Sequence, residues 1–286
     1  MKFLFCLLFV FLFFVPDCSA QTKSPRLIVR GDDMGFAHSG NEAIQKTYRD
    51  GIVTSVEIIV PSPWFPEAVK MLNAYPKIDV GIHIALTSEW DNVKYRPVSN
   101  CPSLVNEDGY FYPMIWPNIN YPGQNLKDKA FKNEDIEKEL RAQIELAIKK
   151  IPRISHISAH MGCYDMTPET KAIAKKIAKE YKIDIDLADY NVKYAPFVGA
   201  HKTSAEKKQS FIKMLEGLKT GETYIFVEHP GLDTPELRAI SHIGYENVAE
   251  DRQGVTDMWT DADVKAAIKK LGIQLISYAD LRQMSK

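Results

Sequence analysis

Apolar and β-branched residues recur along the chain in short runs, and stretches with helical periodicity separate most of these runs. The runs predict strands at residues 26–30, 53–60, 80–86, 154–159, 183–186, 224–228 and 274–277. The helical patterns cover residues 41–50, 66–74, 133–150, 168–181, 204–218 and 261–271. Strands that alternate with helices indicate a parallel sheet with helical crossovers. We therefore expect an α/β fold, a distorted (β/α) barrel of about seven parallel strands, with a doubly wound open sheet as the alternative.

Residues 89–132 interrupt this alternation directly after the third expected strand. The stretch is rich in Pro, Asn, Tyr and Trp. Loops of this length in compact domains are uncommon and are usually functional or mobile. We expect an insertion over one end of the barrel, within a single domain that spans residues 21–286.

Residues 1–20 have the pattern of an export signal. Lys2 precedes an apolar run, and small residues follow before Gln21. The run is shorter than the roughly 20 residues that cross a bilayer. We expect cleavage near Gln21, a periplasmic or secreted protein, and no stable membrane insertion afterwards. An uncleaved anchor is one alternative; lipid attachment at Cys18 is another, which Asp17 disfavours.

Charge and cysteine content exclude some functions. The chain has 36 basic and 37 acidic residues and a net charge of −1, whereas nucleic-acid binders usually carry a basic excess. After the signal only Cys101 and Cys163 remain. Two cysteines do not form a disulfide framework, and we do not expect them to pair.

Polar residues with metal-binding or acid–base chemistry lie at the ends of four expected strands. Asp32 and Asp33 follow the first strand, His83 lies in the third, His160 ends the fourth, and His229 follows the sixth. Catalytic side chains of parallel α/β folds gather where strands end and loops begin. We expect these five residues to meet at one site.

Asp33, His83 and His160 form a candidate ligand set. One carboxylate and two imidazoles suit a divalent ion that keeps open positions for water and substrate. The imidazoles favour Zn²⁺, although Mg²⁺ or another divalent ion is compatible with the set. Taken alone, Asp33 is a plausible helix cap, and a lone histidine on an apolar strand is more often a core residue. Their combination favours the metal site.

The remaining histidines have simpler interpretations. His156 precedes His160 by four residues, so it lies on the same strand face one layer deeper. We assign it to core packing or to support of the site. His38, His201 and His242 lie in polar contexts and are expected at the surface.

In their order and spacing these motifs resemble the YdjC/ChbG family of carbohydrate deacetylases. The similar segments are 32–36 (DDMGF), 41–44 (NEAI), 51–56 (GIVTSV), 81–87 (GIHIALT), 156–160 (HISAH), 228–231 (EHPG) and 272–278 (GIQLISY). The resemblance extends over nearly all of the chain after the signal.

The resemblance implies a distorted barrel that hydrolyses N-acetyl groups on substrates similar to chitooligosaccharides. It implies that Asp33, His83 and His160 bind the metal, that Asp32 is the base and that His229 is the acid. Two positions depart from the family pattern. Gly162 stands where a second histidine is often found after the third metal ligand, and no basic residue is obvious near 185–186. The exact sugar therefore stays open.

Aromatic residues supply candidate contacts to a sugar. Trp64 follows the second expected strand, Trp90 the third, Trp116 lies in the insertion, and Tyr164 follows the third metal motif. Flat aromatic faces with polar edges suit sugar rings. The alternative is that some of these residues pack the insertion onto the barrel.

We therefore expect a metal-dependent hydrolase that removes N-acetyl groups from amino-sugar oligosaccharides. One alternative is an O-acetyl esterase or another amide hydrolase with the same fold. A second is a non-catalytic exported carbohydrate-binding protein, against which Asp32 and His229 argue because binding alone requires no acid–base pair. Phosphoester hydrolysis is disfavoured because the sequence has no glycine-rich phosphate cradle.

Overall fold

A curved parallel sheet forms the centre of the computed structural model, which describes residues 24–284. Its strands are β1 (Arg26–Met34), β2 (Ser55–Ile58), β3 (Asp79–Ile84), β4 (His156–Ala159), β5 (Lys193–Tyr194), β6 (Thr223–Glu228) and β7 (Gln274–Leu275). The order is β4-β3-β2-β1-β6-β5, and β7 pairs with β1. Every strand pair is parallel. Among the described residues no pairing joins β4 to β5, so the expected distorted barrel is confirmed in an open form.

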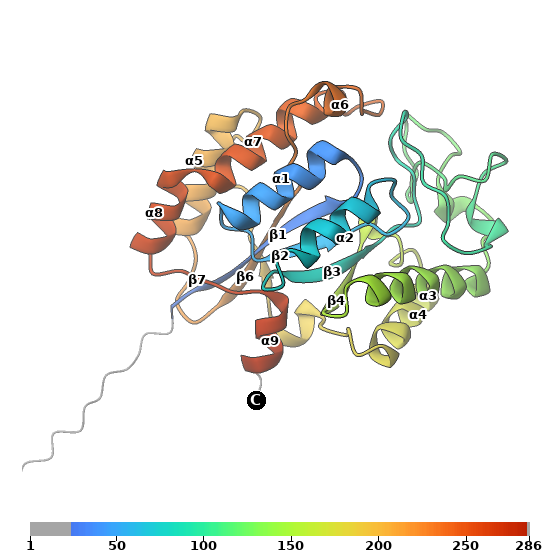
Figure 1. The fold of residues 1–286 in the computed structure, drawn as a ribbon, viewed down its shortest axis with the longest axis horizontal. Helices are drawn as coiled ribbons and strands as arrows, with labels where there is room; N and C mark the ends of the chain where they lie inside the picture. Colours follow the sequence, from blue (N-terminus) through green and yellow to red (C-terminus); the bar gives the residue numbers. More distant parts are fainter. Residues whose placement is uncertain (1–23, 285–286) are drawn as a thin grey trace, which may run out of the picture.

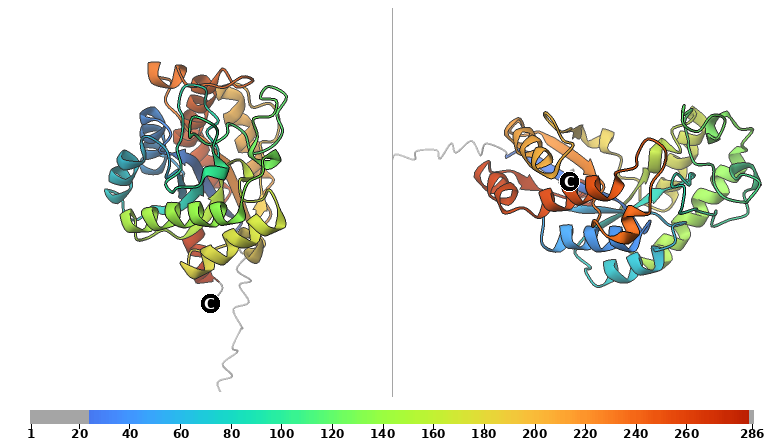
Figure 2. Two further views of the ribbon diagram at one scale, coloured as in Figure 1. Left: turned by 90° about the vertical axis from the view of Figure 1, so that its right-hand side faces the viewer. Right: turned by 90° about the horizontal axis from the view of Figure 1, so that it is seen from above.

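Helices surround the sheet, as Figures 1 and 2 show. They are α1 (His38–Arg49), α2 (Phe65–Asn73), α3 (Asn133–Lys150), α4 (Pro168–Glu180), α5 (Ser204–Glu216), α6 (Pro235–Arg238), α7 (Val248–Thr260), α8 (Ala262–Lys270) and α9 (Tyr278–Met284). Neighbours pack as the pairs α3–α4, α1–α2, α1–α7, α5–α7 and α5–α8. Short 3₁₀ turns are η1 (Pro102–Leu104), η2 (Leu126–Asp128), η3 (His160–Gly162) and η4 (Leu187–Tyr190).

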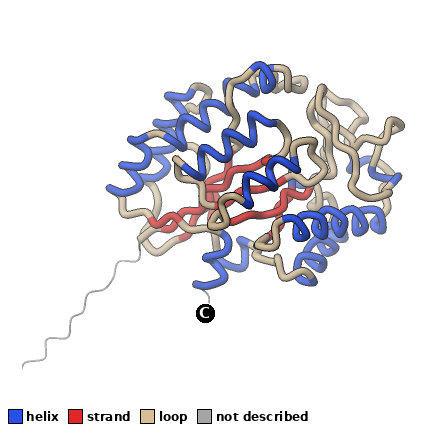
Figure 3. Tube along the Cα trace, viewed as in Figure 1, coloured by secondary structure: helices blue, strands red, loops and turns tan. Residues whose placement is uncertain are grey.

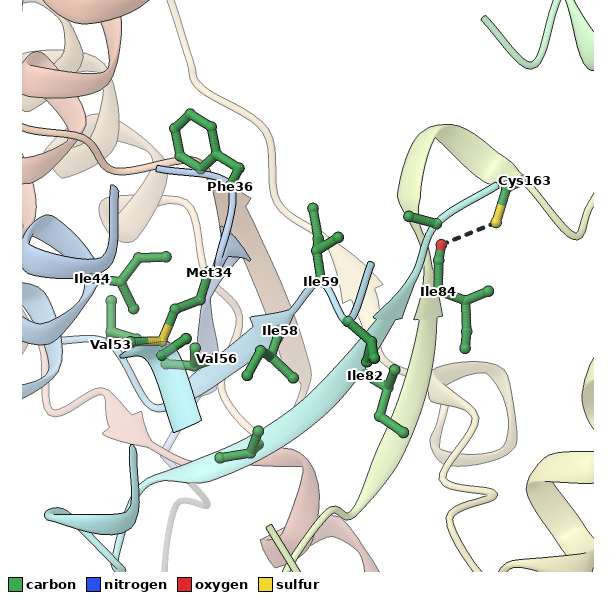
Figure 4. Packing of buried hydrophobic residues seen from close by; sticks show 14 of the residues in the cluster. Met34, Phe36, Ile44, Val53, Val56, Ile58, Ile59, Ile82, Ile84 and Cys163 are labelled. Atoms are coloured by element: carbon green, nitrogen blue, oxygen red, sulfur yellow. Dashed lines mark hydrogen bonds between the residues drawn. The ribbon is translucent and has the colours of Figure 1, made fainter. Parts of the chain in front are cut away.

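The core occupies both faces of β1. Leu27 and Val29 belong to the main apolar cluster, whereas Ile28 lies in a second cluster on the other face. Successive side chains of a strand point to opposite faces, so a strand buried on both sides has a continuous apolar sequence. In the main cluster, residues of β2 and β3 such as Ile58 and Ile82 lie side by side (Figure 4).

The fifth strand differs from the expectation. Residues 183–186 are irregular, and β5 lies at Lys193–Tyr194 instead. Ile183 and Ile185 are buried while Asp184 is exposed, which produces the alternation of a strand. However, the Ile183 N–H bonds the carbonyl of Ala178 at the end of α4 and not a neighbouring strand. The predicted strand at 183–186 is therefore wrong, because alternating burial does not by itself supply a pairing partner.

The stretch between β3 and α3 is irregular apart from η1 and η2. Glu139 of α3 is fully buried and accepts hydrogen bonds from the backbone N–H groups of Val98 and Ser99. The Tyr121 hydroxyl donates to Asp91 and accepts from the Ile243 N–H. These bonds tie the insertion to α3 and to the loop after α6. Figure 3 shows it as tan loops at one end of the molecule, beyond the strands.

The expected export signal, residues 1–20, lies outside the described residues. Across residues 24–284, none of the helices combines the length and apolar character that a bilayer crossing requires. Cys101 and Cys163 are both buried and both free thiols. The Cys163 thiol lies 3.0 Å from the carbonyl oxygen of Ile84, a contact drawn in Figure 4.

Candidate active site

A β-bulge at the end of β1 aims both aspartates into one cavity. The register between β1 and β2 shifts between Gly31 and Met34. Within this bulge Asp33 has a φ of 70°, in the left-handed region that Asp tolerates better than most residues. Consecutive strand residues would otherwise point to opposite faces. The bulge thus lets Asp32 and Asp33 line the same cavity, where both are buried.

Asp33, His83 and His160 converge as a possible metal site. One ligand atom from each lies within 4.8 Å of the others, and all three residues are buried. Asp33 Oδ1 is 3.6 Å from His83 Nε2 and 3.3 Å from His160 Nδ1. This carboxylate oxygen has no hydrogen-bond partner. A buried acceptor without a partner is costly, and a cation held between it and the two imidazoles would satisfy it.

The electrostatics of the two imidazoles differ. Burial is the main cause that lowers the pKa of His83, to about 4, so its ring is neutral near pH 7. Burial also lowers the pKa of His160, but Glu89 and Asp33 outweigh it and raise that pKa to about 10. Burial would raise the pKa of Asp33, yet His229, Arg252 and His160 lower it well below its usual range. Asp33 is therefore ionised, as a metal ligand must be.

The second oxygen of Asp33 pairs with Arg252. The Arg252 Nη2 group lies 2.9 Å from Asp33 Oδ2, and both side chains are buried. The Arg252 guanidinium carbon lies 4.6 Å from the ring centroid of Phe36 and 5.1 Å from that of Trp90. Aromatic faces attract a guanidinium. Arg252 thus neutralises one oxygen of Asp33 and leaves the other facing the imidazoles.

Glu89, the first residue of the insertion, faces the other side of His160. Its Oε1 lies 3.2 Å from His160 Nε2, and the residue is 8% exposed. His160 therefore lies between two carboxylates, Asp33 at Nδ1 and Glu89 at Nε2. A carboxylate on the outer nitrogen of a metal-binding histidine orients the ring and raises its basicity.

Arg30 forms a bidentate salt bridge with Asp32. Its Nε and Nη2 donate to Asp32 Oδ1 and Oδ2 over 2.7 Å and 2.8 Å. The third nitrogen, Nη1, donates to the Tyr278 hydroxyl over 2.8 Å. A carboxylate has about four acceptor sites, so two stay available on Asp32. The cation that pairs with Asp32 is thus Arg30 of β1, two residues earlier in the chain.

His229 lies at the wall of the same cavity, in the loop after β6. Its Nε2 is 4.0 Å from Asp33 Oδ2, its Nδ1 is 3.7 Å from Glu228 Oε2, and its side chain is 39% exposed. Burial lowers the pKa of His229, but the carboxylates of Asp33 and Glu228 outweigh this and raise it. A partly exposed imidazole with a raised pKa is suited to donate a proton.

The structure also places the remaining histidines. His156 is fully buried beneath the site, with its Nε2 2.5 Å from Glu57 Oε1. Its ring stacks on Tyr278 with centroids 3.5 Å apart. His38 contacts Glu67 near the surface, and His201 is exposed.

The four aromatic candidates lie in different places. Trp90 lines the cavity of about 500 Å³ that contains the aspartates and histidines. Trp116 lies at its rim, 37% exposed, and its indole N–H donates over 2.9 Å to the carbonyl of Met161, which lines the cavity. Tyr164 instead lines a neighbouring cavity of about 660 Å³ beside residues 183–189. Trp64 is 39% exposed and packs against His38, with ring centroids 5.2 Å apart.

Gly162 has a structural reason to be glycine. Its φ is +69°, and an added Cβ would lie 3.4 Å from the indole nitrogen of Trp116. Met161 before it has a φ of 50°. Two consecutive left-handed residues turn the chain sharply after His160. A side chain at 162 would be strained by this left-handed backbone conformation, although it would meet Trp116 only at ordinary contact distance.

Three charged residues of the site were not anticipated from the sequence: Arg30, Glu89 and Arg252. The sequence does indicate Arg30 as a site residue, because it precedes Asp32 by two and residues two apart on a strand share a face. The sequence also indicates that Arg252 is buried, because its spacing places it on the same face of a helix as the buried Val248, Val255 and Trp259. No helix was expected at 248–260, so this face was not recognised. Glu89 has no comparable signal.

The chain is similar to known proteins over most of its length. Residues 26–270 match the family of YdjC-like proteins. A carbohydrate deacetylase of Geobacillus stearothermophilus is 26% identical over 267 residues, which cover 90% of this chain and 98% of the relative. A carbohydrate deacetylase of Brevibacillus brevis is 28% identical, covering 90% of this chain and 99% of the relative.

A solved structure has the same fold. It is an Enterococcus faecalis V583 protein, described as a candidate cellobiose-phosphate cleavage protein. The TM-score is 0.70 at 23% sequence identity, and the match covers 90% of this chain and 99% of the other. The match over residues 26–270 and the full-length similarity to the two deacetylases agree with the geometry of the site, and the chain belongs to the YdjC-like protein family.

Proposed function

We propose that the protein is a metal-dependent hydrolase that removes N-acetyl groups from amino-sugar units of oligosaccharides. The observation that carries this proposal is the buried Asp33 Oδ1, which faces one nitrogen of His83 and one of His160 without a hydrogen-bond partner. The names of the relatives, carbohydrate deacetylases, support the substrate class. Two imidazoles in the set favour Zn²⁺ over Mg²⁺ or another divalent ion.

Asp32 is the proposed base. When bound, a divalent metal supplies Lewis acidity, which polarises an acetyl carbonyl and makes water a stronger acid. Asp32 lines the same cavity, and its Oδ2 lies 3.6 Å from His83 Nε2. The acceptor sites of this carboxylate that Arg30 leaves free therefore lie beside the proposed metal ligands. The two hydrogen bonds from Arg30 fix the plane of the Asp32 carboxylate. Asp32 then takes the proton of the attacking water.

His229 is the proposed acid. The amine of an amide is a poor leaving group until it is protonated. His229 lines the cavity near Asp33, and its pKa is raised by Asp33 and Glu228 against the effect of burial. It therefore holds a proton that it can pass to the departing sugar nitrogen. Each such positioned transfer contributes on the order of 10²–10⁴-fold.

Sugar contacts are proposed at the aromatic residues near the cavity. Trp90 in the wall and Trp116 at the rim are the nearest candidates. Trp64 and Tyr164 lie farther along the surface and in the neighbouring cavity, where they could meet more distant units of a chain.

The test combines metal analysis with acetate release from N-acetylated oligosaccharides. We expect one equivalent of bound divalent metal, acetate release that a chelator abolishes, and loss of metal in His160→Ala. Acetate release from O-acetylated glycans alone would favour an esterase. Glycan binding by metal-loaded protein without turnover would favour a binding protein. Full activity after chelation would overturn the proposal.

We also propose that the protein is exported and that its signal is cleaved. The support is the sequence of residues 1–20, with a basic start, an apolar run and small residues before Gln21. Fractionation of the natural host and N-terminal sequencing test this. A cytoplasmic protein that retains Met1 would refute it.

A further inference from the structure

A buried polar network lies directly under the proposed metal ligand His83. It involves three neighbouring strands, with β3 between β2 and β4 (Figure 4). Glu57 of β2 is fully buried, and Ser158 of β4 is 8% exposed. Ser158 is the cross-strand neighbour of His83. Its Oγ lies 2.7 Å from His83 Nδ1 and 2.6 Å from Glu57 Oε2.

The donors and acceptors of this network can be assigned one by one. Glu57 is ionised, because the facing His156 and Arg30 outweigh burial and lower its pKa to about 2. An ionised carboxylate only accepts, so the single hydroxyl proton of Ser158 goes to Glu57. The Ser158 oxygen can then only accept from His83. The Nδ1 atom of His83 must therefore carry the proton of this hydrogen bond.

With Nδ1 protonated, Nε2 is the nitrogen of His83 that can present a lone pair. That nitrogen faces Asp32 Oδ2 and Asp33 Oδ1, each 3.6 Å away. A metal ligand must present a lone pair toward the ion, and the hydrogen bond at its other nitrogen selects the tautomer. The opposite tautomer would point an N–H group at the site and block it.

We propose that Ser158, held by Glu57, fixes His83 in the tautomer whose Nε2 lone pair faces Asp33. Ser158 and Glu57 are thereby positioning residues for metal binding. This inference rests on the proposed role of His83 as a ligand. The relay runs from the Glu57 carboxylate through the Ser158 hydroxyl to His83 Nδ1.

His156 and Gly81 keep Glu57 in place. Glu57, Gly81 and His156 are in register across β2, β3 and β4. The Glu57 and His156 side chains meet above Gly81, where an added Cβ would lie 2.4 Å from His156 Nε2 and 2.5 Å from Glu57 Oε1. The absence of a side chain at Gly81 thus leaves space for the Glu57 carboxylate. One of its oxygens pairs with His156, and the other accepts from Ser158.

The direct test is the tautomer of His83 in metal-free protein. Nitrogen-15 NMR of histidine-labelled protein distinguishes protonated from unprotonated ring nitrogens, and the His83→Gln variant identifies the signal. We expect Nδ1 protonated and Nε2 unprotonated in the wild type. In Ser158→Ala we expect a mixture of tautomers, and in Ser158→Thr, which keeps the hydroxyl, the wild-type tautomer. A wild-type His83 protonated on Nε2 would overturn the proposal.

Metal affinity gives the second readout. Loss of such a supporting bond typically costs 10–100-fold in metal affinity, and we expect this loss in Ser158→Ala and Glu57→Gln by competition with a chelator. The matched control is Ser99→Ala, because the Ser99 hydroxyl also donates over 2.6 Å to a fully buried carboxylate, that of Glu139, but contacts neither Glu57 nor His83. Equal affinity in all three variants and the wild type would overturn the relay. A wild type that binds no metal would instead refute the proposed function, while NMR would still decide the tautomer.

Discussion

Gly81→Ala is the substitution whose effect the structure defines most closely. The new methyl group would lie 2.4 Å from His156 Nε2 and 2.5 Å and 2.6 Å from the two carboxylate oxygens of Glu57. These distances are far below the roughly 3.5–4.0 Å of a favourable contact between heavy atoms. Glu57 and His156 are both fully buried, so neither can swing into solvent. The pair must separate or the strands must move apart.

The magnitude follows from these two responses. Forcing an extra methyl group into a packed core costs about 1–3 kcal/mol. Separating Glu57 from His156 costs about 1–3 kcal/mol or more, because it leaves a buried carboxylate oxygen without its hydrogen-bond partner. We therefore expect Gly81→Ala to lower the free energy of unfolding by about 3 kcal/mol or more, and to weaken metal binding through the displaced Glu57.

Urea denaturation followed by far-UV circular dichroism measures this change in metal-free protein. Gly31→Ala is the matched control, because Gly31 also lies in a central buried strand and an added Cβ would meet nothing closer than 3.7 Å. We expect the control to stay within about 1 kcal/mol of the wild type. If Gly81→Ala is as stable as Gly31→Ala, the reasoning about the buried pair is refuted.

Three further predictions concern the site. Asp32→Asn should retain the metal and lose about 10²–10⁴-fold in kcat, since an amide cannot take the proton; an active variant would reject the base. Arg252→Met should lower the free energy of unfolding of metal-free protein by about 3–5 kcal/mol, because Asp33 Oδ2 loses its buried partner; an unchanged urea midpoint would contradict this. Trp116→Ala should raise KM up to about tenfold with little change in kcat, as expected for a lost aromatic contact. Trp64→Ala is the comparison, because Trp64 is about as exposed as Trp116 but packs against His38. If only Trp64→Ala raises KM, Trp116 is not the sugar contact.

The sequence by itself determined the class of fold and the position of the reactive residues along each strand. Apolar runs separated by helical patterns mark β1, β2, β3, β4 and β6 close to where the structure has them. Parallel strands bring their carboxyl ends to one edge, so the prediction that Asp33, His83 and His160 converge needed only the pattern and the topology that it implies. These features depend on local periodicity, which one chain shows directly.

Only the tertiary structure decided which partners surround these residues. Arg252 comes from α7, Glu89 from the insertion and Glu57 from the middle of β2, and each reaches the site through contacts between segments far apart in the sequence. Residues 183–186 likewise show that a local pattern does not establish tertiary contacts. Their alternating burial fits a strand, but no strand of the described sheet pairs with them. Strand pairing and buried charge pairs are relations between distant residues. Periodicity along the chain predicts which side chains are buried, but only the packing of the folded chain determines what each buried side chain contacts.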